Sequence, residues 1–166
     1  MILNTILTIL GVLFLVFFES FLLAFVNFRF SIVLFFFLFK KIDWKLLIIS
    51  FAILFFVFDV VKNFPLGTNL LIVSVVLGVM ILASLFFSTD TGLSSFFIRT
   101  FVFFLYYILL LILPPFFTVG TLGTVSIRNL VISLFKGIIS ALLVAFFDNM
   151  FTNFRKRGNS SQIRLK

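Results

Sequence analysis

The stretch FDVVKNFPLGTN, residues 58–69, separates two long apolar runs and holds the densest set of specific residue types in the chain. Asp59 and Lys62 lie three residues apart, which places them on one face of a helix. Pro65 cannot continue that helix, and Gly67 tolerates the positive φ that a tight turn requires. The stretch therefore predicts a helical hairpin with an acid and a base in the last turns of its first helix.

Thr68 or Asn69 is expected to cap the second helix of this hairpin by accepting a hydrogen bond from a first-turn amide. Two interpretations of the charged residues are open. In the first, Asp59 and Lys62 pair with each other or with capping groups and only stabilise the hairpin. In the second, Asp59 faces inward and contacts a partner helix or a ligand, since a buried acid in a membrane span is costly and is a functional candidate.

The composition is that of a membrane protein. Of the 166 residues, 63% are hydrophobic and 11% are charged, whereas a soluble domain has roughly a quarter charged residues. The apolar residues form long blocks that approach the roughly 20 residues needed to cross a bilayer. We predict an all-α membrane protein with about six transmembrane helices in one bundle, residues 1–152, followed by a basic, disordered cytoplasmic tail, residues 153–166.

The expected spans cover about residues 2–26, 30–39, 46–61, 70–87, 95–113 and 130–147. The second span, Phe30–Phe39, is too short to cross comfortably, so it either thins the bilayer, tilts or forms a re-entrant piece. Pro114 and Pro115 are expected to end the fifth span and to start a loop that reaches residue 126. Small residues in the fourth span, Gly78 among them, are of the kind that allow close helix approach.

The basic residues predict an orientation. Lys40, Lys41 and Lys45 share one short loop, and five of the 13 basic residues lie in the last dozen positions. Loops rich in Lys and Arg remain in the cytoplasm. With six crossings the N- and C-termini are both cytoplasmic, and the turn at residues 59–69 faces away from the cytoplasm.

Two ionisable residues, Glu19 and Lys136, lie within apolar spans, where such groups are functional candidates by default. Glu19 is near the end of its span, within reach of the interface, and Lys136 is expected to snorkel to the near surface. Lys136 has three alternative acidic partners across the bundle: Glu19, Asp59 or Asp148. Arg99 is interpreted as an interfacial anchor and Asp148 as part of a solvated helix end.

The chain contains no Cys and no His. The sequence shows no Ser/His/Asp or Cys/His set, no Gly-rich phosphate loop and no metal-ligand cluster. We therefore predict a protein that is not an enzyme and has no cofactor. The net charge of +8 is expected to set topology and to contact anionic headgroups, with no role in nucleic-acid binding.

The turn resembles a motif of the rod shape-determining protein MreD family, in which a helix ends in Asp-Leu-Leu-x-Gly-x-Pro-Leu-Gly and another helix follows. The matching residues here are Asp59, Val60, Val61, Pro65, Leu66 and Gly67. The chain length and the layout of six spans with a short second span resemble that family too. The sequence departs from the family pattern at Asn63, where the family usually has Gly. The Pro-Asp pair that often opens the second span is also absent.

The resemblance implies a non-catalytic membrane subunit of the bacterial cell-elongation machinery, which makes peptidoglycan. Its partners would be an MreC-like protein and, directly or indirectly, the MreB filament, the glycosyltransferase RodA and its transpeptidase. It also implies a fold similar to the S components of energy-coupling-factor transporters. The candidate partner-contact or structural motif comprises Asp59, Lys62, Pro65, Leu66 and Gly67.

The alternative function is a substrate-binding membrane subunit of a vitamin-type transporter. Such a subunit needs a polar pocket within its helices. The candidates for that pocket are Glu19, Asp59, Lys136 and Tyr106.

Overall fold

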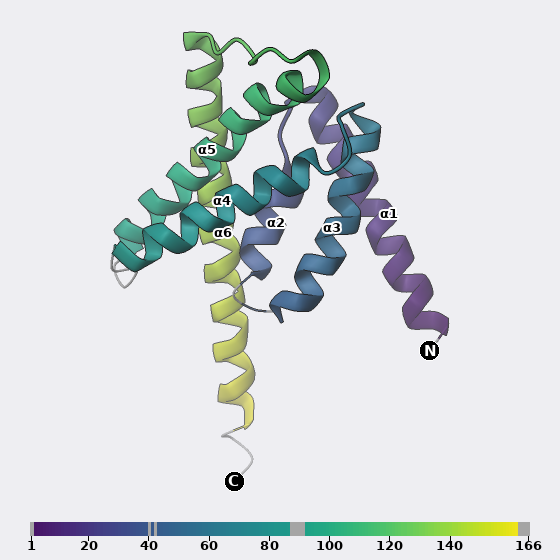
Figure 1. Cartoon of the computed structure of the whole chain (residues 1–166). Coiled ribbons are helices and arrows are strands. Elements are labelled where there is room, and N and C mark those ends of the chain that lie inside the picture. Colours follow the sequence, from purple (N-terminus) through teal and green to yellow (C-terminus); the bar gives the residue numbers. More distant parts are fainter. Residues whose placement is uncertain (1, 40, 42, 87–91, 163–166) are drawn as a thin grey trace. The chain divides into compact units, whose positions relative to one another are not determined.

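The computed structural model describes residues 2–39, 41, 43–86 and 92–162. All regular secondary structure in these residues is helical, which confirms the predicted all-α class. The helices are α1 (Ile2–Phe25), α2 (Phe30–Leu38), α3 (Trp44–Val61), α4 (Thr68–Phe86), α5 (Gly92–Val119) and α6 (Ile127–Gln162) (Figure 1). The chain forms two compact units, Met1–Leu54 and Phe55–Lys166, so that α3 begins in the first unit and ends in the second.

Three of the described helical segments are long and apolar enough to cross a membrane: α4, α5 and the part of α6 from Ile127 to Thr152. Their most apolar windows have mean hydropathies of 2.5, 2.4 and 2.4, although only 22–28% of the residues in those windows are buried in the protein. Large exposed apolar surfaces of this kind require lipid or protein to cover them. These helices indicate a membrane-embedded protein, and the full count of six spans stays a prediction.

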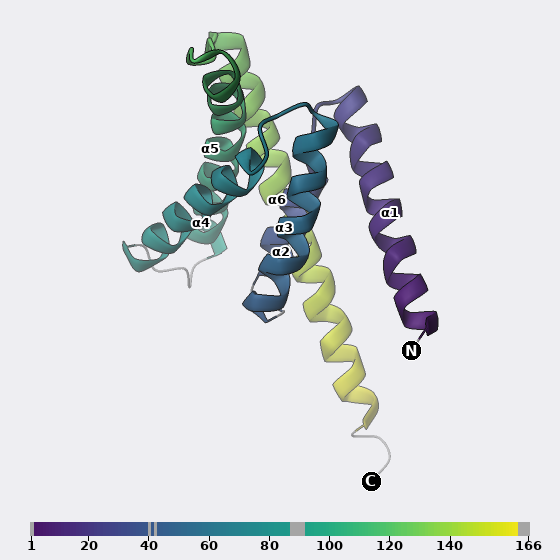
Figure 2. The ribbon, with the colours of Figure 1, turned by 45° about the vertical axis from the view of Figure 1, so that its right-hand side comes forward.

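In the second unit, α5 packs against both α4 and α6 (Figures 1 and 2). It buries Val102, Phe103, Tyr106 and Tyr107. The helix α6 approaches α5 closely at Gly137, where an added Cβ would lie 3.0 Å from the Phe104 nitrogen. A glycine here lets the two backbones meet, as small residues do in membrane helices.

The predicted close approach through α4 is not found at Gly78, because no neighbouring atom lies within 4 Å of a Cβ built there. The small residues that are buried lie instead on α6, four residues apart: Ser133, Gly137 and Ala141. The spacing in α6 keeps all three on one helix face, whereas the small residues of α4 follow no such repeat.

The expectation that Pro114 and Pro115 end the fifth span is wrong, because α5 continues through both prolines to Val119. A proline in a helix removes one amide donor but leaves the rest of the ladder intact. In an apolar environment the remaining backbone groups are best satisfied by staying helical. The Thr118 hydroxyl donates to the Pro114 carbonyl oxygen at 3.0 Å, which supports the last turn.

The segment after α5 folds back onto the helix. Gly120 adopts a φ of 73° and ends the helix, as glycine commonly does. The Gly123 amide then donates to the Ile112 carbonyl oxygen at 3.4 Å. A Cβ on Gly123 would overlap the carbonyl oxygen of Leu111, which has lost its helical donor because residue 115 is proline. The loop is therefore shorter than predicted and is held against the prolines.

The helix α6 runs to Gln162, ten residues beyond the predicted end of the transmembrane domain. Residues 153–162, which were expected to be disordered, are thus helical. Arg, Lys and Gln are all good helix formers, and the preceding turns of α6 supply the nucleus that an isolated basic segment would lack. The rest of the predicted tail, residues 163–166, lies outside the described residues.

In the first unit, α2 lies against α1. With nine residues at 1.5 Å each, α2 is about 13 Å long, less than half of the roughly 30 Å hydrocarbon core of a bilayer. Its shortness agrees with the sequence prediction. Whether the segment crosses the membrane stays a prediction. The lysine loop that follows includes Lys40, which lies outside the described residues.

Candidate functional site

The helix α3 ends in a left-handed turn at Asn63, whose φ is 53°. The Phe64 amide donates to the Asp59 carbonyl oxygen at 2.8 Å, and the Asn63 amide donates to the Val60 carbonyl oxygen at 3.1 Å. This pair of bonds is the Schellman arrangement, which satisfies the last carbonyls of a helix. The backbone of Asp59 is thus part of the helix end.

The Asp59 side chain caps the next helix. Its carboxylate accepts hydrogen bonds from the Gly67 amide at 2.8 Å, from the Asn69 amide at 3.1 Å and from the Asn69 side-chain amide at 2.6 Å. Asp59 is fully buried, with 0% of its surface exposed. A carboxylate at the first amides of a helix is stabilised both by those donors and by the helix dipole.

The predicted capping roles of Thr68 and Asn69 are therefore wrong. Asn69 donates to the acid, and the Thr68 hydroxyl donates to the Pro65 carbonyl oxygen at 2.7 Å. A carboxylate carries a full charge and is a stronger acceptor than a hydroxyl or an amide oxygen, so it takes the first-turn amides of α4. We call the segment Asp59–Asn69 the Asp59 turn.

The other members of the predicted motif lie around this turn. Gly67 has a φ of 89°, the left-handed conformation that its sequence position predicted. Lys62 is half-buried, and within the described residues no ion pair joins it to Asp59. Of the open interpretations of Asp59, the geometry favours bonding to capping groups. Leu66 is 71% exposed at the tip of the turn.

The connection between α1 and α2 is built in the same way. Glu19 is fully buried, with 0% exposed, and accepts hydrogen bonds from the Ser31 amide at 2.8 Å and the Ser31 hydroxyl at 3.0 Å. The chain turns at Asn27, whose φ is 51°, and the Phe28 amide bonds back to the Leu22 carbonyl oxygen. We call Glu19–Ser31 the Glu19 turn. Glu19 is a cap for α2.

Sequence reasoning missed this second acid-capped turn, although a signal was present. Both turns contain the dipeptide Asn-Phe, at residues 27–28 and 63–64. In each case an acid lies upstream in the first helix and a residue with a polar side chain, Ser31 or Asn69, lies at the start of the second. The same dipeptide occurs at residues 153–154 within α6, so it indicates a turn only where it separates two apolar runs.

The α5–α6 pair carries the other polar groups. The Lys136 ammonium lies over the Tyr107 ring, 5.7 Å from its centroid, a cation–π distance. The Tyr107 hydroxyl lies 3.5 Å from the Ser140 hydroxyl. Ser140 is fully buried, so the pair forms a polar contact inside an otherwise apolar interface.

Arg99 and Asp148 form an ion pair, with Nη1 and Oδ2 2.9 Å apart. The two residues join α5 to α6. The interpretation of Asp148 as part of a solvated helix end is wrong, because α6 continues well past Asp148; the interpretation of Arg99 as an interfacial anchor stays a prediction. The side chains are 24% and 34% exposed, so screening limits what the pair adds to stability.

A cavity of about 550 Å³, widely open to its surroundings, lies between the Asp59 turn and the end of α5. On one side it is lined by Lys62, Asn63 and Phe64, and on the other by residues of α5 from Leu110 to Val119. Its lining includes none of the residues expected to form a polar pocket: Glu19, Asp59, Tyr106 and Lys136. In the part of the chain that the structure describes, no three His, Cys, Asp or Glu side chains gather as metal ligands.

Comparison of the chain with models of protein families, with curated proteins and with solved structures gives no match.

Proposed function

We propose that this protein is a non-catalytic membrane scaffold of the bacterial cell-elongation machinery, related to the MreD family. The observation that supports the proposal is the geometry of the Asp59 turn. Asp59 caps α4 and Gly67 takes a positive φ, so these motif residues are the ones that this turn requires. Asn63 stands where the family usually has Gly and adopts the left-handed conformation that Gly and Asn tolerate best.

The proposed scaffold acts through a rigid turn that presents an apolar tip. Both oxygens of Asp59 accept hydrogen bonds, so the backbone from Asp59 to Asn69 is closely held. Leu66 and Val60 are 71% and 63% exposed. In a membrane protein, exposed apolar side chains are covered either by lipid or by a partner protein. A partner such as an MreC-like protein would cover Leu66.

We also propose how the chain crosses the membrane. Six spans would lie in the plasma membrane, with both termini cytoplasmic and the Asp59 turn on the opposite face, in a fold similar to the S components of energy-coupling-factor transporters. The three long apolar helices and the short α2 are compatible with that layout.

A cell-shape experiment tests the function. The chromosomal gene is replaced in its own bacterium by variants with Leu66→Asp or Pro65→Ala, and cell shape and co-purification with the MreC-like protein are measured. For Leu66→Asp we expect rounded cells and loss of co-purification with the MreC-like protein, while the amount of the variant in the membrane is unchanged. The matched control is Leu122→Asp, since Leu122 is 66% exposed in the α5–α6 loop. Rod-shaped cells with full co-purification in Leu66→Asp would reject the proposal.

The alternative function, a substrate-binding subunit of a vitamin-type transporter, rests on the 550 Å³ cavity, which falls in the range of roughly 300–1,000 Å³ of small-molecule sites. Its lining is mostly apolar, which suits a polar vitamin poorly. Uptake of radiolabelled vitamins by cells that also express an energising module is the test. Absence of accumulation for every vitamin tried removes this alternative.

A further inference from the structure

The cavity beside the Asp59 turn combines two free donors with an apolar wall. Lys62 is half-buried and Asn63 is exposed, and neither side chain makes a hydrogen bond or an ion pair among the described residues. Opposite them lie Leu110, Leu111, Pro114 and Val119 of α5. One end of the cavity therefore offers positive charge and an amide, and the rest offers hydrocarbon.

The length of α5 indicates the depth of this cavity in a bilayer. The helix has 28 residues and is thus about 42 Å long, close to the roughly 40–45 Å of a bilayer with its headgroups. Pro114 to Val119 are the last six residues of α5, so they lie near the headgroup level. Leu110 and Leu111, one turn earlier, lie near the upper part of the acyl chains.

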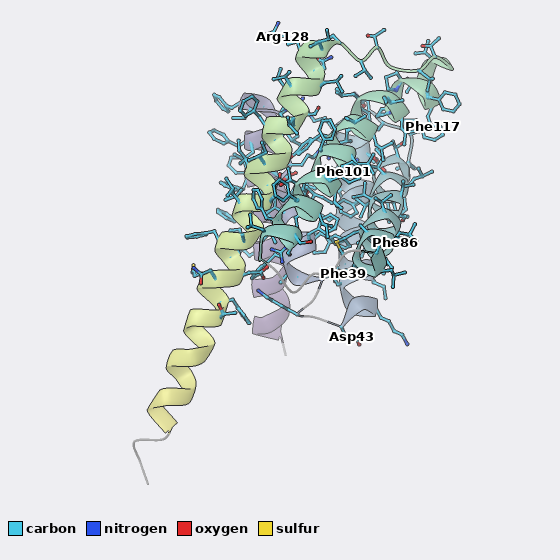
Figure 3. The ribbon with its side chains drawn as sticks, turned by 90° about the vertical axis from the view of Figure 1, so that its left-hand side faces the viewer. Phe39, Asp43, Phe86, Phe101, Phe117 and Arg128 are labelled. Carbon is cyan, nitrogen blue, oxygen red and sulfur yellow. The ribbon has the colours of Figure 1, made fainter. Side chains whose placement is uncertain are left out.

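The charge at this end of the second unit is positive. Arg128, at the start of α6, lies at the same end as Phe117 of α5, and Phe86 lies at the other end (Figure 3). The acid at this end, Asp59, is buried and directed to the amides of α4. A negatively charged group in the cavity would therefore meet Lys62 without an opposing exposed carboxylate from the turn.

We propose that the cavity binds an anionic phospholipid. The phosphate lies against the Lys62 ammonium and the Asn63 side-chain amide, and the first part of one acyl chain lies along Leu110, Leu111 and Val119. Ammonium and amide donors to phosphate form charge-assisted hydrogen bonds, and the acyl chain is removed from water by the apolar wall. The inference depends on membrane embedding and is independent of the scaffold function proposed above.

Native mass spectrometry of the purified full chain in detergent tests the site. The protein is mixed with phosphatidylglycerol or with phosphatidylcholine of identical acyl chains. We expect the first to bind at least about fivefold more tightly, since one basic residue near a membrane surface contributes about 1 kcal/mol toward an anionic lipid. Lys62→Ala should abolish that preference, and Lys62→Arg should retain it.

Two further variants separate this site from general charge effects. Arg128→Ala removes an exposed cation at the same end that does not line the cavity, and it should leave the preference unchanged. Leu110→Trp narrows the apolar part of the cavity and should weaken the binding of both lipids. The proposal would be overturned if Lys62→Ala and Arg128→Ala reduced the preference for phosphatidylglycerol equally, or if Lys62→Ala did not reduce it. Displacement of the lipid by inorganic phosphate alone would also overturn it, since the acyl chain would then contribute nothing.

Discussion

Asp59 is costly to bury and is compensated by three hydrogen bonds from Gly67 and Asn69. Hydrogen bonds to charged groups contribute about 1.5–3 kcal/mol each, and donors left buried without acceptors are penalised. We expect Asp59→Ala to lower the free energy of unfolding by about 3 kcal/mol or more. The free energy of unfolding of Asp59→Asn should lie between those of this variant and the wild type, because its side-chain oxygen can still accept while its NH₂ group faces other donors. Denaturation in detergent followed by circular dichroism measures both.

Lys62→Ala is the control for this prediction. Lys62 makes no hydrogen bond or ion pair among the described residues, so its removal should change the free energy of unfolding by no more than about 0.5 kcal/mol. If Lys62→Ala costs as much as Asp59→Ala, the two side chains pair with each other, and the capping interpretation of Asp59 is wrong.

Asn63 tests the conformation of the turn at the level of one residue. Its φ of 53° costs most residues about 1–2 kcal/mol, while Gly and, less often, Asn adopt it routinely. We expect Asn63→Ala to destabilise the protein by about 1 kcal/mol and Asn63→Gly to be neutral within about 0.5 kcal/mol. Thermal unfolding of the two variants in one detergent gives the comparison. Equal stabilities would show that the left-handed turn is not a requirement.

At the scale of elements, the end of α5 depends on Gly123. A Cβ on Gly123 would overlap the Leu111 carbonyl oxygen and lie 3.2 Å from Pro115, and backbone atoms cannot move aside cheaply. We expect Gly123→Ala to destabilise the protein by about 1–3 kcal/mol and to speed proteolysis of the α5–α6 loop. Gly78→Ala is the control, because the space around Gly78 is open and alanine favours helix by about 1 kcal/mol. Equal effects at both glycines would contradict this packing.

The sequence predicted the elements better than their contacts. Long apolar runs located the helices, and the Pro-Leu-Gly stretch located the turn, because both signals are local. The prediction that Pro114 and Pro115 end α5 was wrong. Where no water is present to bond the backbone, staying helical satisfies the remaining backbone groups best. The pairs Glu19–Ser31 and Arg99–Asp148 were not predicted, because their partners are 12 and 49 residues apart and only the fold brings them together.

At the scale of the whole molecule, one kind of helix end recurs. The helices α1, α3 and α5 each end at a residue with positive φ: Asn27, Asn63 and Gly120. In the first two cases, an acid of the outgoing helix then caps the next helix, through Ser31 and Asn69. These caps satisfy helix amides that lipid cannot bond. Two of these three turns are thus closed by an acid cap.

In the proposed layout, where α1 and α3 cross the membrane, the number of crossings depends on α2, which at about 13 Å is too short to span an undistorted bilayer. If α2 crosses, there are six spans and the two termini share a side. If it does not, five spans put the termini on opposite sides. The chain has no cysteine, so single-cysteine variants report on topology without background.

We expect Asn4→Cys and Lys166→Cys to react with a membrane-impermeant maleimide only after cells are permeabilised, because six crossings place both termini in the cytoplasm. Leu66→Cys, at the tip of the Asp59 turn, should react in intact cells. The expected layout requires α2 to cross with the polar bonds of Ser31 to Glu19 near the outer surface and the lysine loop inside. Labelling of Asn4→Cys and Lys166→Cys from opposite sides would establish an odd number of spans and contradict the six-span layout.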